Sequence, residues 1–335
     1  MRAWVVRRPG PPEALTLTEV DEPVPGDGQV VVRVRAIGLN FADCMARLGV
    51  YPNTPRPPFV PGMEVAGEVT AVGRNAGGLG VGDRVFAVPI FGGHAELVAV
   101  PTTHVAPIPA DMDWDEAAGL AVTGLTADWA LNVVGRVRPG ERVLVTAAAG
   151  GVGTMVLQLA RAQGARVLAV ASTGRKRAFA LELGAEAAVA YDKWAEVADQ
   201  WGGLDLILDS VGGGLFRRAW RHLAGDGRYV LYGFSAASGR RRIRWLRAAG
   251  AWLAMGCMHP LSLVSGTRTL AGFNLSLVPT LAEQLHERHE RLLEARRDGQ
   301  LRVVIGGRYR FGELPDAHAA LQGRESTGKL VVLVD

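Results

Sequence analysis

The chain has 335 residues, which is more than one hydrophobic core usually organises, so we expect two domains. Its formal net charge is only +4, which excludes a bulk nucleic-acid binder because such proteins need concentrated positive charge. Two cysteines, Cys44 and Cys257, are too few for a disulfide framework or a four-thiolate zinc site. The first ten residues lack the apolar run of a secretory signal, so we expect a cytoplasmic protein.

Short β-branched runs dominate roughly the first 110 residues. The runs are separated by Gly, Pro and Asp turns, and they are Val30–Ile37, Glu64–Val72, Arg84–Val88 and Ala95–Val100. This spacing is typical of antiparallel strands that close a barrel or a sandwich. The sequence therefore predicts a β-rich first lobe.

From about residue 120 the pattern changes to short apolar strands that alternate with helical stretches. We predict strands at 142–147, 166–171, 187–191, 204–209, 228–234 and 267–274. We predict helices at 153–163, 175–183, 194–201 and 215–223. Such alternation implies right-handed crossovers and a doubly wound parallel sheet. The expected fold class is α/β, with a Rossmann-type nucleotide-binding lobe.

The last segments are expected to return to the first lobe. Leu281, Leu285 and Leu292 share one face of a helix expected from Thr280 to Arg297. The final run Lys329–Val334 is strand-like. The predicted domains are residues 1–120 together with 278–335, and residues 121–277.

A glycine-rich segment, Ala147–Gly153, follows the first strand of the second lobe and opens a helix. Small residues let the backbone approach a pyrophosphate, and the N–H groups at the helix start meet it with the positive end of the helix dipole. Because the segment lies between a strand and a helix of an alternating unit, it predicts dinucleotide binding. The expected contacts here are Ala149, Gly150, Gly151, Val152 and Gly153.

Cations follow the second strand of this lobe. An NAD-dependent enzyme would carry Asp or Glu there for the ribose 2′-hydroxyl, whereas cations suit a 2′-phosphate. The segment Ser172–Arg177 has no carboxylate and ends in three consecutive cations. Cations oppose the dipole at a helix N-terminus, so an anion should offset them. The sequence therefore predicts NADPH rather than NADH, bound through Ser172, Arg175 and Lys176.

Several segments in a fixed order resemble the medium-chain dehydrogenase/reductase superfamily, in particular its zinc-independent quinone oxidoreductase group. They are residues 38–43, 49–52, 61–67, 81–85, 147–153, 209–213 and 327–329. Residues 40–45, 61–64 and 272–275 also resemble the vesicle amine transport protein branch of that group. The resemblance implies a GroES-like catalytic domain and a Rossmann cofactor domain.

The alcohol dehydrogenases of this superfamily hold a catalytic zinc with a Cys, a His and a second Cys. At the matching positions this chain has Asn40, Met63 and Gly119. An amide and a thioether do not replace thiolate and imidazole as zinc ligands. The segment 95–113 also lacks the four structural-zinc cysteines. We therefore expect no zinc.

Without a metal, the acceptor itself must delocalise the charge that a hydride brings. Quinones and α,β-unsaturated carbonyls do so as hydroquinone anions or enolates, and NADPH supplies the hydride. The prediction is an NADPH-dependent quinone or enone reductase. Enoyl thioester reduction is the enzymatic alternative, and the other alternative is an NADPH-binding membrane-associated or regulatory protein with low turnover.

The resemblance implies two residues at the reacting end. In related enoyl thioester reductases a tyrosine at the place of Tyr51 is taken to protonate the α-carbon, and a phenol is protonated at pH 7. Otherwise Tyr51 is a loop aromatic packed on Pro52 and Pro55. Asn40 offers an amide donor to the substrate oxygen or the nicotinamide ribose, or else it satisfies backbone groups in a turn.

The neighbours of these two residues are expected to support them. Asp43 either orients Asn40 or caps a helix at 44–48, and we favour the cap. Glu64 is expected to bond to structure beneath the site. His94 has no evident acid partner in the sequence, so we interpret it as a structural or pocket-wall histidine. Cys44 is interpreted as a small buried hydrophobe.

Further cofactor contacts are expected at the domain crossover and at the carboxyl ends of strands, where open α/β sheets bind ligands. Thr123 and Thr126 lie near the crossover, and Tyr191 resembles an aromatic position that helps to hold the adenosine phosphate. The other expected contacts are Val211, Gly233, Phe234, Ser235, Phe273, Asn274 and Lys329.

Residues Ala236 to Gly266 combine five arginines with Trp245 and Trp252. This composition fits a weak membrane-surface contact, or, in a weaker alternative, single-stranded nucleic acid. We favour a lid or a dimer edge because Gly and Pro shorten any helix there. The resemblance also implies a homodimer that pairs through the strand at 267–274. Because the net charge is low, we expect no nucleic-acid partner.

Overall fold

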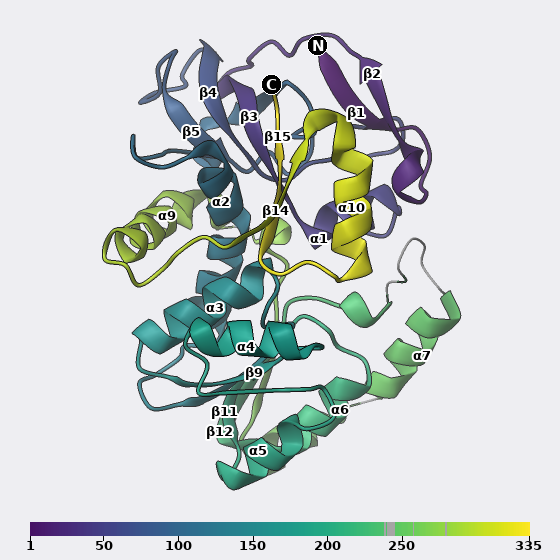
Figure 1. Ribbon diagram of the computed structural model, residues 1–335, viewed down its shortest axis with the longest axis vertical. Coiled ribbons are helices and arrows are strands. Elements are labelled where there is room, and N and C mark those ends of the chain that lie inside the picture. Colours follow the sequence, from purple (N-terminus) through teal and green to yellow (C-terminus); the bar gives the residue numbers. More distant parts are fainter. Residues whose placement is uncertain (238, 240–244, 257, 279) are drawn as a thin grey trace.

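The computed structural model describes residues 1–237, 239, 245–256, 258–278 and 280–335. Two lobes are joined by the long helix α2 (Trp114–Asp128) (Figure 1). The upper lobe of Figure 1 holds both chain ends, and the lower lobe holds the parallel sheet. The predicted domain boundary at residue 120 falls inside α2.

The upper lobe contains a mostly antiparallel sheet that confirms the predicted β-rich lobe. Its strand order is β14 (Ile305–Arg310), β15 (Lys329–Leu333), β3 (Gln29–Leu39), β4 (Val65–Val72), β5 (Arg84–Ala87) and β7 (Val105–Pro107), with β6 (Leu97–Pro101) also paired to β3. A separate hairpin joins β1 (Arg2–Val6) and β2 (Leu15–Glu19). Because β15 pairs with β3, the last strand returns to the first lobe as expected.

The lower lobe contains a six-stranded parallel sheet. Its order is β10 (Ala187–Val189), β9 (Arg166–Val170), β8 (Arg142–Thr146), β11 (Leu204–Asp209), β12 (Leu223–Leu231) and β13 (Thr269–Gly272). The crossover helices are α3 (Gly151–Ala162), α4 (Gly174–Glu182), α5 (Trp194–Gln200) and α6 (Gly214–Arg221). The doubly wound prediction is confirmed. The strand order reverses at β8, so ligands are expected beside its carboxyl end.

Helix α2 was not predicted from the sequence. It continues into a π-helical turn at Trp129–Val134, and nearly all of it from Ala117 to Leu131 is buried. A helix that is apolar all round shows no amphipathic period, which explains the miss. Of the described residues, Trp114–Val134 is the one helix long and apolar enough to cross a membrane, but 72% of its apolar window is buried inside the protein. We interpret it as a core helix.

Other helices differ from the prediction in extent. Helix α9 (Leu281–Arg297) is confirmed, and it buries the three leucines named for it. Helix α1 spans Phe41–Arg47 and not 44–48, because Asn40 is its N-cap. Helix α10 (Leu314–Gly323) was not predicted.

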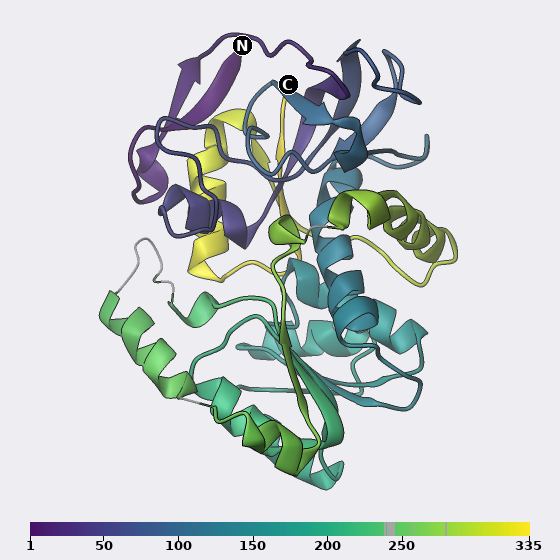
Figure 2. The ribbon, with the colours of Figure 1, turned by 180° about the vertical axis from the view of Figure 1, so that it is seen from behind.

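Two helices, α7 (Trp245–Met255) and α8 (Leu261–Gly266), flank the lower lobe (Figures 1 and 2). Helix α7 packs against α6. The predicted basic-apolar segment at 236–266 therefore forms two short helices in its described part. Most of its arginines, at 240–244, lie outside the described residues.

Candidate functional site

The glycine-rich turn lies at the carboxyl end of β8, where the strand order reverses. Gly150 is the N-cap of α3 and has no side chain to bond the first N–H groups of the helix. A Cβ on Gly153 would lie 2.6 Å from the carbonyl oxygens of Ala147 and Ala148, so only glycine lets the helix begin this close to the strand. The open N-terminus of α3 therefore fits a pyrophosphate.

Two distant residues hold the glycine-rich turn in place. The hydroxyl of Tyr191 accepts the N–H of Ala147 at 3.1 Å, and the N–H of Gly328 donates to the carbonyl of Ala149 at 2.8 Å. The structure thus brings Tyr191 and the segment before Lys329 to the predicted phosphate site.

The loops after β11, β12 and β13 meet beside the turn. Asp209 is buried and accepts the N–H groups of Val211 at 2.8 Å and Gly212 at 3.0 Å. The N–H of Ser235 donates to the carbonyl of Ser210 at 3.1 Å. The ring of Phe273 stacks on Tyr232. The expected contacts in these loops, namely Val211, Gly233, Phe234, Ser235, Phe273 and Asn274, are therefore neighbours along one edge of the sheet.

The expected phosphate-binding cations lie in the first turn of α4, which follows β9. Arg175 is exposed, and the Lys176 ammonium donates to the carbonyl of Arg324 at 2.7 Å. Burial and the like charge of Arg175 lower the pKa of Lys176. An anion bound here would raise that pKa again, because an opposite charge favours the charged form of the amine. Arg324 follows α10 and was not predicted; its guanidinium donates to the carbonyl of Ser235.

The two threonines expected at the crossover use their hydroxyl hydrogens within α2. Thr123 donates to the carbonyl of Gly119 at 2.5 Å, and Thr126 donates to that of Val122 at 2.7 Å. Thr123 is buried against Gly151 of the glycine-rich turn. Thr123 therefore supports the turn by packing, and its oxygen keeps lone pairs to accept a hydrogen bond.

Three buried side chains of the first lobe form a closed triangle of hydrogen bonds. The Lys329 ammonium donates to Asn40 Oδ1 at 2.8 Å and to Glu64 Oε2 at 2.5 Å. Asn40 Nδ2 donates to Glu64 Oε2 at 2.9 Å. The other Glu64 oxygen accepts the N–H of Val122 at 2.6 Å, so the expected buried support by Glu64 is confirmed.

The charges in this triangle fix the orientation of the Asn40 amide. With the amide reversed, its NH2 group would face an ammonium and its oxygen would face a carboxylate. Its two N–H hydrogens go to Glu64 and to the carbonyl of Gly38 at 3.1 Å. Asn40 therefore presents an acceptor oxygen, and not the donor that we expected, to any ligand.

Tyr51 lies in the first lobe and contacts the second. Its hydroxyl donates to Asn274 Oδ1 at 2.9 Å and lies 2.8 Å from Ser276 Oγ. Burial raises the pKa of Tyr51, against the opposite effect of these two hydrogen bonds. The structure thus brings together Tyr51 and Asn274, which are expected site residues from opposite lobes, and it adds Ser276, which carries no sequence signal.

Four further polar residues lie behind this site. Asp43 is the third residue of α1 and accepts the N–H of Asn40, the N-cap, at 2.8 Å. Asp43 therefore lies inside the helix and supports its N-cap, and the expectation that it caps a helix at 44–48 is wrong. His94 is fully buried, and its Nε2 lies 4.0 Å from Asp43 Oδ2. This corrects the expectation that His94 has no acid partner. Cys44 is buried as expected, and its sulfur lies 3.6 Å from His318 Nδ1.

The positions that match the family's zinc ligands hold other groups. Met63 is buried, and the ammonium of Lys329 is bonded to Asn40. A Cβ on Gly119 would lie 3.6 Å from Lys329 Cγ, so the lysine stem runs past this position too. In the described part of the chain, no three His, Cys, Asp or Glu side chains are arranged to hold a metal.

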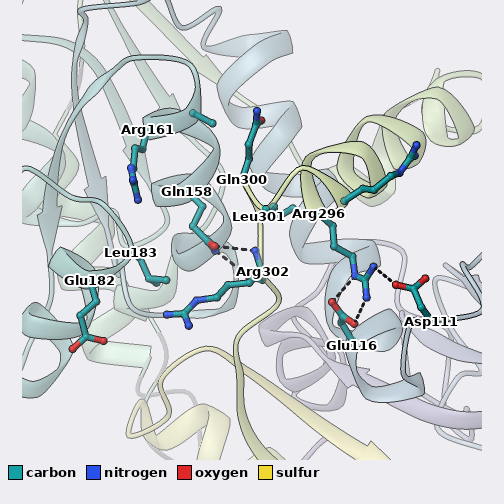
Figure 3. Close-up of a pocket in the computed structure, with 13 residues that line it drawn as sticks. Asp111, Glu116, Gln158, Arg161, Glu182, Leu183, Arg296, Gln300, Leu301 and Arg302 are labelled. Atoms are coloured by element: carbon teal, nitrogen blue, oxygen red, sulfur yellow. Dashed lines mark hydrogen bonds and ion pairs between the residues drawn. The ribbon is translucent and has the colours of Figure 1, made fainter.

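A cavity of about 710 Å³ is lined by a different set of residues (Figure 3). It is lined by the ends of α3 and α9 and by the segment 299–302. Arg296 is paired there with Glu116 at 2.7 Å and with Asp111 at 3.1 Å. Arginines in the last turn of a helix complement its dipole. None of the expected site residues lines this cavity.

Two family models match the chain. An alcohol dehydrogenase GroES-like domain matches residues 26–110, and a zinc-binding dehydrogenase domain matches residues 151–254. The synaptic vesicle membrane protein VAT-1 homolog of Danio rerio is 32% identical over 320 residues, which cover 94% of this chain and 66% of that protein.

Solved structures are similar over almost the whole chain. The quinone oxidoreductase of Thermus thermophilus, solved also with NADPH, is 40% identical with a TM-score of 0.81, and the match covers 99% of this chain and 100% of that one. The Escherichia coli quinone oxidoreductase in complex with NADPH is 27% identical with a TM-score of 0.88, and the coverage is 99% and 100%. The chain belongs to the medium-chain dehydrogenase/reductase family and is a quinone oxidoreductase-like NAD(P)H-dependent oxidoreductase.

Proposed function

We propose that this protein is an NADPH-dependent, metal-free reductase that transfers a hydride to a quinone or to an α,β-unsaturated carbonyl. The observation that carries this proposal is the position of the Lys329 ammonium. It is bonded to Asn40 and Glu64 at the place where the resemblance locates the metal of alcohol dehydrogenases. A divalent cation there would meet a fixed positive charge, an amide and a thioether. The acceptor must therefore delocalise its own negative charge.

Bound NADPH supplies the hydride in this proposal. The chain supplies the rest: the start of α3 binds the pyrophosphate, and Arg175 and Lys176 bind the 2′-phosphate. Asn40 accepts a hydrogen bond from a ribose hydroxyl, because its oxygen is the part left to a ligand. The acceptor takes up the hydride and becomes an anion. The Tyr51 hydroxyl then gives that anion its proton, and solvent restores the phenol.

The preference for NADPH is supported by two observations. The cations at the end of β9 lie without a carboxylate among residues 172–177, and the similar oxidoreductases of Thermus thermophilus and Escherichia coli were solved with NADPH. The open start of α3 and the close approach required at Gly153 fit the same cofactor.

We further propose that the protein acts as a homodimer that pairs through β13. This strand is at the edge of the sheet, and an exposed edge tends to pair with another strand. On α7 and α8, the apolar side chains of Leu246, Trp252, Leu253, Leu261 and Val264 are 66% to 90% exposed, as in an interaction surface. Sedimentation of the wild type and of Leu270→Arg tests this: a monomeric variant supports β13 as the interface, and a monomeric wild type refutes the dimer.

The test of the activity is NADPH oxidation against a panel of quinones, alkenals and enoyl thioesters, with and without a chelator. Quinones or alkenals as the best acceptors, unaffected by the chelator, are expected. Loss of activity on chelation would refute the metal-free proposal. Preference for enoyl thioesters would favour the enoyl reductase alternative, in which Tyr51 protonates carbon.

A non-enzymatic alternative uses the same exposed segment. If NADPH binds but no acceptor oxidises it, and if vesicles of anionic lipid bind the protein, the apolar side chains of α7 and α8 are a membrane contact instead. Trp252→Ala, which removes the exposed ring, would then weaken vesicle binding and leave NADPH binding unchanged.

A further inference from the structure

Three polar side chains from the two lobes meet at the Tyr51 hydroxyl. Tyr51 Oη lies 2.9 Å from Asn274 Oδ1 and 2.8 Å from Ser276 Oγ. Ser276 Oγ in turn lies 3.0 Å from Asn274 Oδ1. Each pair of oxygens is therefore within hydrogen-bond distance. We call this closed group of Tyr51, Asn274 and Ser276 the tyrosine cluster.

The local sequence fixes the orientation of the Asn274 amide. Asn274 is the N-cap of the short 3₁₀ helix η5 (Leu275–Leu277), and its Oδ1 accepts the N–H of Ser276 at 3.2 Å. Asparagine suits this position because its side chain reaches the backbone two residues further on, and the buried Leu275 anchors the turn. A backbone N–H can only donate, so the atom that faces it is the amide oxygen. Asn274 therefore offers Tyr51 an acceptor and no donor.

Two hydroxyl hydrogens serve the three contacts of the tyrosine cluster. If Tyr51 donates to Asn274, then Ser276 donates to Tyr51; if Ser276 donates to Asn274, then Tyr51 donates to Ser276. With both hydrogens on Asn274, two hydroxyl oxygens would face each other at 2.8 Å with no hydrogen between them. The cluster therefore has two arrangements, which differ only in the rotation of the two hydroxyl groups.

Loss of the Tyr51 proton leaves only one of these contacts favourable. A phenolate oxygen has no hydrogen and can only accept, and Asn274 Oδ1 also only accepts. In the described part of the chain, the Ser276 hydroxyl is then the one group within hydrogen-bond distance of Tyr51 Oη that can donate to it. Burial raises the pKa of Tyr51, and the hydrogen bond with Ser276 opposes this effect, because a hydrogen bond to the charged form favours that form.

We propose that Ser276 is a positioning residue for proton donation by Tyr51, and that its hydroxyl stabilises the phenolate which remains when the proton leaves. The proposal rests on the proposed function, in which the acceptor anion takes the Tyr51 proton. In that step the O–H bond of Tyr51 breaks, its hydrogen bonds to the anion, and the electron pair stays on Oη. Ser276 turns its own hydrogen towards Oη, and water then returns a proton to the phenolate. Ser276 acts through Tyr51 and does not touch the acceptor.

The first test compares two substitutions of Ser276. Ser276→Ala removes the hydroxyl and keeps the backbone N–H that holds Asn274. We expect kcat to fall about tenfold, which corresponds to about 1.4 kcal/mol, while KM for the acceptor stays nearly unchanged. Ser276→Thr keeps a hydroxyl and should recover most of the loss. A rise in KM with unchanged kcat, or the same loss of kcat in both variants, would overturn the proposal.

A double-mutant cycle shows whether Ser276 acts through Tyr51. Tyr51→Phe/Ser276→Ala should be no slower than Tyr51→Phe alone, because a phenylalanine has no phenolate for Ser276 to stabilise. Additive losses would contradict the proposal. The matched control is Ser262→Ala on α8, where the hydroxyl donates to the carbonyl of His259 at 2.7 Å. This control should keep the wild-type kcat and KM.

A further measurement needs no substrate. Fluorine NMR of protein labelled with 3-fluorotyrosine follows the titration of each phenol, and the Tyr51 signal is the one missing from Tyr51→Phe. We expect the pKa of Tyr51 to be about one unit higher in Ser276→Ala than in the wild type, or about 1.4 kcal/mol. An unchanged pKa would refute the role of Ser276 even if the protein reduces every acceptor. A raised pKa would support the role of Ser276 even if the protein reduces none, and only the proposed function would then fail.

Discussion

The two sides of the candidate site are built in different ways. The nucleotide side is made by backbone geometry: a strand end, a glycine-rich turn and a helix start within residues 142–162. The opposite side is made by side chains that are far apart in the sequence, since Lys329 bonds to Asn40 across 289 positions. The proposed cofactor side is therefore specified by a local sequence motif. The side that holds Asn40 and Lys329 depends on tertiary packing.

The largest expected effect is on the side built by tertiary packing. Lys329→Met leaves the fully buried Glu64 carboxylate without its cation, and breaking a buried ion pair in this way costs about 3–5 kcal/mol of the free energy of unfolding. Urea denaturation measures the loss. The double variant Glu64→Gln/Lys329→Met removes both charges and should recover much of it; an equal loss in both proteins would show that the charges do not interact.

The sequence anticipated the nucleotide side because its determinants are local. Strand periodicity, the glycines at 150, 151 and 153 and the cations at 175–177 lie in one continuous stretch, and each has a fixed physical meaning. For the opposite side, the sequence predicted individual residues but not the contacts between them. Nothing in the sequence pairs His94 with Asp43 or Tyr51 with Ser276, because these contacts exist only after the sheet and α10 are assembled.

The next effect tests the side built by backbone. Gly153→Ala adds a Cβ that would meet two carbonyl oxygens at 2.6 Å, so the start of α3 must move away from β8. We expect the affinity for NADPH to fall about a hundredfold, which is about 2.7 kcal/mol, as measured by cofactor fluorescence titration. The control Gly140→Ala removes a glycine whose Cβ position is open but whose φ is positive, so it lowers stability and should leave NADPH affinity unchanged.

A smaller effect separates cofactor recognition from turn geometry. Lys176→Ala removes one cation from the first turn of α4 and keeps the glycine-rich turn intact. We expect the affinity for NADPH to fall about tenfold, or about 1.4 kcal/mol, while the affinity for NADH changes little. Calorimetric titration with both cofactors measures this. An equal loss for both would mean that Lys176 holds the loop through Arg324 and does not recognise the phosphate.

The smallest effect concerns the buried carboxyl behind the reacting end. Because the pKa of Asp43 is raised to about 7 in the folded protein from about 3.9 in the unfolded chain, the folded state binds a proton more tightly. The stability that this proton gives is complete below the unfolded pKa and is lost as the pH rises through the folded pKa.

Between pH 6 and pH 8 we expect the free energy of unfolding of the wild type to fall by about 1 kcal/mol more than that of Asp43→Asn does. Urea denaturation at the two pH values measures the difference, and the two proteins can be compared because the rest of the titrating groups are the same in both. Equal losses would mean that Asp43 is ionised throughout this range. The side of the candidate site built by tertiary packing would then tolerate a buried negative charge.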